Sequence, residues 1–307
     1  MENWQPSSLS WSFTRKGRFD TCRRRYFYDR FWGQDPKLRW KLYEMRNITT
    51  LAKLRGQIVH DVISRALHSI RLGVDVDIEI AKQSVNEVIR EKYMESQRRL
   101  WHFDNRPPGR KLSEITNLHE HYYSYPDIGD RARDARQVAW TCLENLLSSD
   151  IWREIAASDT KQWMEIDEEG FPSFDLDGIR IFTKIDFAHS NGNRTIIDWK
   201  TGSPSADNRR QLALYSLYAQ AKWEWPPEET DLAAVYLYPE FTVDVFRPTA
   251  EDVEAVKTQA RQSFEEILAL EPAYGPADIE AFPPTEDTRR CEWCRFRRIC
   301  GVSGPSI

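Results

Sequence analysis

A short apolar strand that ends in polar residues is the stretch of this sequence best suited to chemistry. Residues 195–202 read TIIDWKTG, so two isoleucines are followed by Asp198 and Lys200. Side chains two positions apart on a strand project from the same face. A second expected strand, 182–187, carries another carboxylate, Asp186, near its end. Two carboxylates and one ammonium group can hold a divalent metal and help to activate a water molecule.

An Asp-x-Lys pair is also common on solvated surfaces, so its meaning depends on the motifs that accompany it. Residues 49–72 are predicted to form a helix, because apolar residues recur in them at helical spacing. This helix contains His60 among apolar neighbours, where a single histidine is more often structural than a ligand. Gly56, one turn earlier, has no side chain and would allow another segment to approach closely.

The composition is that of an ordinary globular chain with two basic ends. Its 307 residues, 40% hydrophobic and 30% charged, suffice for one large domain or a core domain with a helical elaboration. No apolar run is long enough to cross a bilayer and the first residues do not form a signal peptide, so we expect a cytoplasmic protein. The net charge is -5, but seven Lys or Arg lie between residues 14 and 30 and five Arg between residues 289 and 300. These runs indicate either a local positive surface or solvated helix faces.

The remaining periodicity predicts helices in the first half of the chain and strands mixed with helices in the second. A helix capped by Ser10 or Ser12 is expected first, and further helices over residues 78–100, 131–158, 208–218 and 250–270. Strands are expected over residues 163–167, 179–189, 195–200, 232–238 and 241–247, with a hairpin at 190–193. Residues 102–130 read as a long loop with His119 and His121 on its surface. This order predicts an α/β core in which three consecutive antiparallel strands carry Glu165, Asp186, Asp198 and Lys200.

The cysteines suggest a second, separate metal site. Cys291, Cys294 and Cys300 fall within ten residues, a spacing typical of metal ligands that lack a fourth partner. Cys142 lies in an apolar helical stretch and is expected to pack there, which leaves Cys22 as the fourth ligand. Four thiolates bind either an iron–sulfur cluster or zinc. One distant cysteine combined with Cys-x2-Cys-x5-Cys favours the cluster, which would join the two ends of the chain.

Taken together, these motifs resemble the PD-(D/E)xK nuclease superfamily in its RecB-like branch. The iron–sulfur members of that branch, the CRISPR-adaptation exonuclease family and the AddB-type nuclease domains, are the most similar. The matching residues occur in the family's order: Cys22, the Gly56-x3-His60 helix, Asp186, the Asp198-x-Lys200 strand, the Gln211-x3-Tyr215 helix, and the triplet Cys291, Cys294 and Cys300. Two features depart from the family: Arg23 replaces a proline after the first cysteine, and Thr183 and Lys184 stand where glycine often precedes Asp186.

The resemblance implies a restriction-endonuclease-like α/β fold, with a mixed central sheet flanked by helices and an N-terminal helical elaboration. A four-cysteine cluster would connect the N- and C-terminal segments. The implied division has four parts: a cluster-ligand segment, a helical region with His60, a nuclease core and a cluster-binding segment, over residues 1–48, 49–160, 161–270 and 271–307.

The resemblance also implies an activity, that of a Mg²⁺- or Mn²⁺-dependent DNA exonuclease acting on single-stranded or frayed ends. Its metal ligands would be His60, Asp186, Asp198 and the main-chain carbonyl of Trp199, with Lys200 acting on the attacking water. Glu165 would be an outer or alternate ligand. Gln211, Tyr215, Arg24, Arg25 and Tyr26 would contact the substrate, and Cys22, Cys291, Cys294 and Cys300 would hold a [4Fe-4S] cluster.

Two other functions are compatible with the same motifs. One is a non-catalytic iron–sulfur subunit that binds DNA or assembles a repair or CRISPR-adaptation complex. The intact Asp186, Asp198 and Lys200 argue against it. The other is an RNA-processing enzyme in which the cysteines hold zinc. Proteins of CRISPR adaptation, recombinational repair or anti-phage defence are the expected partners, besides DNA itself.

Overall fold

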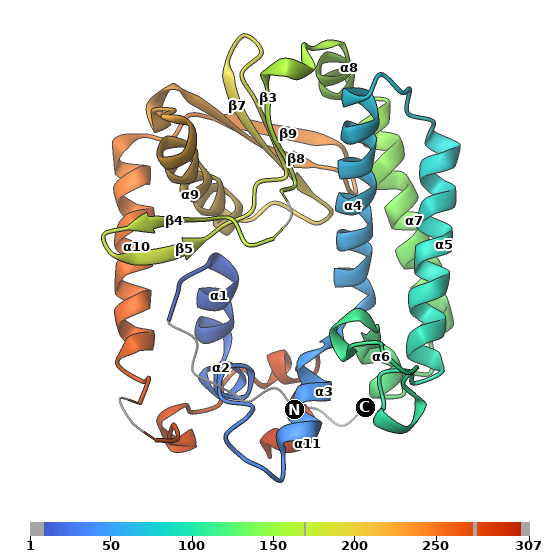
Figure 1. Cartoon of the computed structure of the whole chain (residues 1–307), viewed down its shortest axis with the longest axis vertical. Coiled ribbons are helices and arrows are strands. Elements are labelled where there is room, and N and C mark those ends of the chain that lie inside the picture. The colour runs from blue at the N-terminus through green and yellow to red at the C-terminus, as the bar shows by residue number, and fades with distance from the viewer. Residues whose placement is uncertain (1–8, 169, 273–274, 302–307) are drawn as a thin grey trace. The chain divides into compact units, whose positions relative to one another are not determined.

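The computed structural model describes residues 9–168, 170–272 and 275–301 (Figure 1). Its contacts divide the chain into two units. The first unit comprises residues 1–50, 92–126 and 260–307, and the second comprises residues 51–91 and 127–259. The four-part division expected from the sequence remains a prediction.

The second unit is built on a five-stranded mixed sheet. Its strands follow the order β3, β6, β7, β8, β9, and they span Trp163–Ile166, Phe187–His189, Arg194–Lys200, Thr230–Tyr236 and Thr242–Phe246. Only the β7–β8 pair is parallel among these strands; the other neighbours are antiparallel. Helix α9 (Ala206–Trp223) connects β7 to β8, as a parallel pair requires. The arrangement confirms the expected mixed α/β fold.

The alternation of side chains along β7 decides which residues face α9. Ile196 belongs to an apolar cluster with Leu212 and Tyr215 of α9 and with Leu232 of β8. A strand has a period of two, so Asp198 and Lys200 follow Ile196 on that same face. Burying a large aliphatic side chain such as Leu212 stabilises the fold by about 1.5–3 kcal/mol. The apolar half of this face therefore fixes the position of its polar end.

Three helices of the second unit come from the first half of the chain: α4 (Leu51–Arg71), α7 (Ile128–Leu147) and α8 (Asp150–Ala157). Helices α4 and α7 run side by side (Figure 1). Cys142 of α7 is fully buried, in agreement with the packing role expected for it. The helix predicted over 131–158 is interrupted, because the Ser149 hydroxyl accepts the N–H of Trp152 and starts α8 as a new helix.

The single strand expected over residues 179–189 is wrong in one respect, because the structure has two strands there, one over residues 179–182 and β6 over residues 187–189. Strands β4 (Ser173–Leu176) and β5 (Ile179–Phe182) form a separate hairpin. Asp177 and Gly178 make its turn with φ values of 53° and 84°, the mirror-image turn that suits tight hairpins. The chain then leaves this hairpin and enters the main sheet at β6, directly after Asp186.

The first unit is mainly helical. Its elements include α1 (Phe13–Thr21), α2 (Arg23–Arg30), α3 (Arg39–Arg46), α6 (His119–Tyr122) and α11 (Arg297–Cys300). Helices α5 (Ile78–Gln97) and α10 (Ala250–Leu268) contribute residues to both units. The Ser12 hydroxyl accepts the Arg15 N–H at 3.1 Å and caps α1, so Ser12 is the cap of the two candidates. Cys22 caps α2, with its Sγ 3.4 Å from the Arg25 nitrogen.

Residues 102–130 are more ordered than the predicted loop. They contain α6 and the strand β2 (Asn117–Leu118), which pairs in parallel with β1 (Ile48–Thr49). His119 is fully buried, with its ring centroid 4.5 Å from that of Tyr123, so the surface position expected for it is wrong. None of the described helices combines the length and the apolarity needed to span a membrane.

Candidate active site

The carboxylate of Asp186 joins helix α4 to the sheet. Its Oδ1 lies 3.0 Å from Nδ1 of His60 on α4. Its Oδ2 accepts a hydrogen bond of 2.8 Å from the main-chain N–H of Trp199 on β7. The main-chain carbonyl of Asp186 accepts from the N–H of Asp167. The histidine and the aspartate, 126 positions apart in the chain, therefore meet as the motifs predicted.

Lys200 is the last residue of β7 and lies on the face of the sheet that packs against α9. Its Nζ lies 2.5 Å from Oδ2 of Asp198 and donates at 2.8 Å to Oε1 of Gln211. Gln211 in turn donates from Nε2 to the Tyr215 hydroxyl at 2.8 Å. Gln211 and Tyr215 are four residues apart on α9, so they share one helix face. A continuous polar chain thus connects β7 to α9.

A hollow of about 400 Å³ opens over these groups. His60, Asp186, Asp198, Lys200 and Gln211 are among the residues that line it, as is Thr201. A Cβ placed on Gly56 would lie 3.2 Å from Thr201 Oγ1. The glycine therefore permits a close approach of α4 to the segment after β7, and this approach sets His60 beside Asp186.

Burial and like charge act differently on the two aspartates. Burial and then the charge of Asp186 raise the pKa of Asp198 to about 6, against the opposing effect of Lys200. Burial also favours a higher pKa at Asp186, but His60 and the Trp199 N–H outweigh it, so the pKa of Asp186 is lowered. Burial lowers the pKa of His60, yet the charge of Asp186 raises it to about 9. The ionised form of Asp198 is thus disfavoured, and an added cation would favour it.

The donor groups of the hollow suit a hard divalent cation by their chemistry. Two carboxylates, an imidazole and the main-chain carbonyl of Trp199 supply oxygen and nitrogen donors. Within the described residues, no three His, Cys, Asp or Glu side chains are grouped so as to hold a metal ion. His60 is directed at Asp186 instead, and Asp198 at Lys200.

Among the candidate ligands of the divalent metal, Glu165 is the one that does not line this hollow. Its Oε2 lies 3.1 Å from Nζ of Lys222 and accepts from the Tyr218 hydroxyl at 3.3 Å. Burial raises the pKa of Glu165, against the lowering effect of Lys222. The carboxylate expected to be an outer or alternate ligand is therefore buried and pairs with the exposed Lys222 of α9.

Some residues that line the hollow were not singled out in the sequence, among them Asn208 and Thr201. Asn208 lies three positions before Gln211 on α9 and donates from Nδ2 to the Tyr236 hydroxyl at 3.1 Å. Thr201 directly follows Lys200 and contacts the Gly56 position. The helical spacing of Asn208 and Gln211 could have indicated the first of these.

The four candidate cluster cysteines gather in the first unit. The Cys291 and Cys294 main chains form a turn, with the Cys294 N–H bonded to the Cys291 carbonyl at 3.1 Å. Burial, with smaller contributions from Cys22 and Cys300, raises the pKa of Cys294 to about 11. Burial also raises the pKa of Cys291, with Cys22 adding to the effect. The four thiols are therefore close enough to influence one another, although they do not form a ready metal-binding group among the described residues.

The aromatic and basic run next to Cys22 has a structural role. Tyr26 is only 3% exposed and its ring lies 5.3 Å from that of Phe19. Tyr26 was expected to contact the substrate, but its ring is part of the core. Arg24 donates from Nε to the Phe282 carbonyl at 2.8 Å. Substrate contacts from Arg24 and Arg25 remain predictions.

Known proteins resemble this chain at the level of a protein family and of solved structures. No curated protein matches the chain, whereas nine chains of solved structures do. The crystal structure of SSO0001 is 17% identical, with 60% of this chain and 78% of that one covered and a TM-score of 0.30. A protein from Eubacterium rectale described as a candidate exonuclease is 13% identical, with coverages of 60% and 73% and a TM-score of 0.33. The family model of the PD-(D/E)XK nuclease superfamily matches residues 10–301, and the chain belongs to that superfamily.

Proposed function

We propose that this protein is a divalent-metal-dependent deoxyribonuclease whose chemical centre is formed by Asp186, Asp198, Lys200 and His60. The position of Lys200 carries the proposal: its Nζ contacts Asp198 and Gln211 in a hollow that Asp186 and His60 also line. Nucleases of this superfamily typically use metals such as Mg²⁺ or Mn²⁺. Asp186, Asp198, His60 and the Trp199 carbonyl would hold the ion, and the imidazole favours Mn²⁺. When bound, the ion supplies Lewis acidity at the phosphate.

The protein's own groups would orient the water and the phosphate. The Lys200 ammonium group, held by Asp198 and Gln211, places a positive charge where negative charge develops on the phosphate oxygens. Burial raises the pKa of Tyr215 well above its usual value, with Asp198 and Asp186 adding to the effect. The Tyr215 hydroxyl therefore stays protonated, and together with Gln211 it would position the scissile phosphate or an unstacked base.

The substitution Lys200→Ala tests this assignment. Its cleavage of a labelled oligonucleotide in Mg²⁺ or Mn²⁺ should fall by roughly 10²–10⁴-fold, the range for loss of a group that acts on developing charge or on a proton. Thermal stability and DNA binding should change little. Lys161→Ala, an exposed lysine of the same unit, is the control and should cut normally. Wild-type activity in the Lys200→Ala protein would disprove the site, and a chelator should stop cleavage by the wild-type protein.

We further propose that the enzyme is an exonuclease that degrades single-stranded or frayed DNA ends. The small hollow, closed on one side by α4 and on another by α9, supports access by one strand. Linear single-stranded DNA should then be degraded, while circular DNA and RNA of the same sequence resist. Cleavage of the circle would show an endonuclease, and cleavage of RNA alone would favour the RNA-processing alternative.

For the four cysteines we propose a [4Fe-4S] cluster held by Cys22, Cys291, Cys294 and Cys300. Their mutual effects on thiol pKa support a common site. Protein purified without oxygen should contain iron and acid-labile sulfide, and Cys291→Ser should lose both while Cys142→Ser keeps them. Zinc without sulfide would contradict the cluster. Such a protein would act with partners in CRISPR adaptation or recombinational repair.

A further inference from the structure

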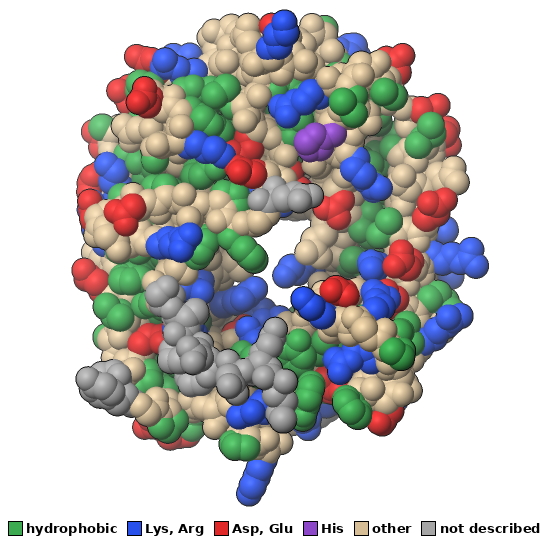
Figure 2. Space-filling model, in the orientation of Figure 1, with side chains coloured by type: hydrophobic (Ala, Val, Ile, Leu, Met, Phe, Trp, Pro, Cys, Tyr) green, Lys and Arg blue, Asp and Glu red, His purple; other side chains and the backbone are tan. Residues whose placement is uncertain are grey.

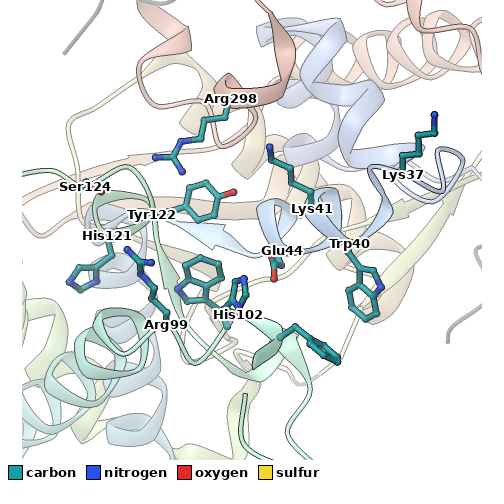
Figure 3. A pocket seen from close by; sticks show the side chains of 12 residues that line it. Lys37, Trp40, Lys41, Glu44, Arg99, His102, His121, Tyr122, Ser124 and Arg298 are labelled. Carbon is teal, nitrogen blue, oxygen red and sulfur yellow. The ribbon is translucent and has the colours of Figure 1, made fainter. Parts of the chain in front are cut away.

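Two hollows of the first unit share a wall of exposed aromatic rings. The first, of about 730 Å³, includes Trp101 and Tyr122 in its lining (Figure 3). The second, of about 1040 Å³, lies over residues 106–113. Trp40 and Phe103 line both hollows. The shared rings make the two hollows adjoining parts of one surface.

The charge of this surface differs from that of the chain as a whole. The lining of the first hollow contains four basic side chains, Lys37, Lys41, Arg99 and Arg298. The second adds five more: Arg39, Arg46, Arg106, Arg110 and Lys111. Among the described residues of the two linings, Glu44 is the one carboxylate. The whole chain, in contrast, carries a net charge of -5, and acidic and basic side chains are interspersed over the face drawn in Figure 2.

The basic groups of the first hollow are available for a ligand. Across residues 9–168, 170–272 and 275–301, no carboxylate forms an ion pair with Lys37, Lys41, Arg99 or Arg298. The Arg298 guanidinium instead lies over the Tyr122 ring, 5.1 Å from its centroid, as Figure 3 shows. Unpaired cations around a hollow focus a positive potential into it and attract anions.

Two aromatic side chains of this surface are exposed to solvent, although rings of this size are usually buried in the core. Trp40 is 53% exposed and Phe103 is 66% exposed, and their ring centroids lie 6.1 Å apart. One exposed ring needs no explanation, but two in contact at the rim of a basic hollow offer a stacking surface. Trp32 and Tyr43 extend it, with ring centroids 5.3 Å apart and an interplanar angle of 30°.

We infer that these adjoining hollows bind single-stranded DNA, with bases stacked on Trp40 and Phe103 and phosphates held by the surrounding Lys and Arg side chains. Stacking rings combined with a basic groove are the usual means of binding a single strand without reading its sequence. A purely acidic peptide would use the cations but not the rings. The choice of DNA among polyanions rests on the proposed function, whereas the location of the binding surface rests on the hollows themselves.

Binding of fluorescent oligothymidine to the Lys200→Ala protein, without added divalent metal, tests the inference. Replacing both rings, as Trp40→Ala with Phe103→Ala, should weaken binding roughly tenfold or more. An abasic strand of equal length should bind the parent Lys200→Ala protein more weakly than oligothymidine does. It should bind this parent and the double ring variant equally. Phe171→Ala removes a ring that is 86% exposed in the other unit and should leave binding unchanged.

A matched pair of arginines just after α5 tests the charge contribution. Arg99 lines the first hollow, whereas its exposed neighbour Arg98 does not. Arg99→Ala should weaken binding and reduce the salt dependence of log K by about 0.7, as loss of one phosphate contact from a single strand predicts. Arg98→Ala should do neither.

If neither the double ring substitution nor Arg99→Ala weakens the binding of oligothymidine, the inference is overturned. This holds even if Lys200-dependent cleavage proves the nuclease. Equal binding of the abasic strand and oligothymidine by the parent would also overturn it, since a simple polyanion site would behave so. Failure of the nuclease proposal would appear separately, as full cleavage by Lys200→Ala.

Discussion

The hollow of the second unit and the basic hollows of the first differ in their balance of charge. The former, which we call the acidic hollow, is lined by the buried Asp186 and Asp198 together with Lys200 and His60. Burial and the charge of Asp186 favour the neutral form of Asp198. The described linings of the latter hold nine basic side chains and one carboxylate. Lys200 and His60 offset the two carboxylates in the first environment, whereas the second carries an excess of positive charge that attracts phosphate groups. We base on this difference the proposal that chemistry and strand binding are carried by separate parts of the chain.

The largest expected effect is that of Asp198→Asn, which would remove the charge that the acidic hollow needs for a metal. Cleavage should fall by at least about 10³-fold, as for loss of a group that holds the catalytic ion. Oligothymidine binding, which we assign to the basic hollows, should be unchanged. Cleavage rates and binding constants measured on one preparation check both, and a parallel loss of binding would break the proposed division.

The same substitution should stabilise the metal-free protein at pH 8. The pKa of Asp198 is raised to about 6, so its ionisation costs stability as pH rises from about 4 through 6, and the full cost is present at pH 8. Asparagine removes that cost, worth about 1–3 kcal/mol for a raised carboxyl pKa. Denaturant unfolding at pH 8 and at pH 4 measures it; a gain of equal size at both pH values would contradict an origin in the ionisation of Asp198.

Metal binding should strengthen with pH because a proton on His60 competes with the ion. The pKa of His60 is raised to about 9, so below that pH the imidazole must lose a proton before it can bind a metal. The apparent affinity for Mn²⁺ should therefore rise by up to about tenfold per pH unit between pH 7 and pH 9. Calorimetry in buffers of different ionisation enthalpy would detect the released proton. His60→Ala should remove this dependence, and if it persists another group is responsible.

Gly56→Val should have a smaller effect that is confined to the acidic hollow. A Cβ at Gly56 already lies 3.2 Å from Thr201 Oγ1, so a branched side chain would push α4 from the segment that follows Lys200. Overpacking of this kind costs about 1–3 kcal/mol, and cleavage should fall with it. Gly129→Ala is the control, since nothing lies within 4 Å of a Cβ there. Urea unfolding and cleavage rates of the two variants decide the point.

The smallest effect on cleavage is expected for Glu165→Gln. Glu165 contacts Lys222 and Tyr218 and does not line the acidic hollow. Loss of the contacts of the buried Glu165 carboxylate should lower stability by about 1–3 kcal/mol and change the cleavage rate less than threefold at a temperature where the protein stays folded. A large loss of cleavage without loss of stability would restore Glu165 as an outer ligand.

The acidic hollow was predictable from the sequence because its residues follow local periodicities. Asp198 and Lys200 share a strand face, Gln211 and Tyr215 share a helix face, and the small residue Gly56 marks a close approach. The split of residues 179–189 into two strands was not predictable, because residues 183–186, where the break falls, contain no Gly or Pro that would mark an interruption.

The basic hollows were not predictable for a different reason. Their residues come from 32–47, 99–124 and Arg298, and no short motif connects these segments. The conspicuous basic run near Cys22 drew attention instead, although Tyr26 proved to be buried. Charge density in the sequence does not report which side chains tertiary packing covers.

Pulsed EPR of Mn²⁺ bound to the protein tests the central claim most directly. We expect one tightly bound ion with a histidine nitrogen in its coordination sphere, a signal that His60→Ala removes while the ion stays bound more weakly. Asp186→Asn and Asp198→Asn should each release the ion. Tight Mn²⁺ binding that survives both aspartate substitutions would contradict the account.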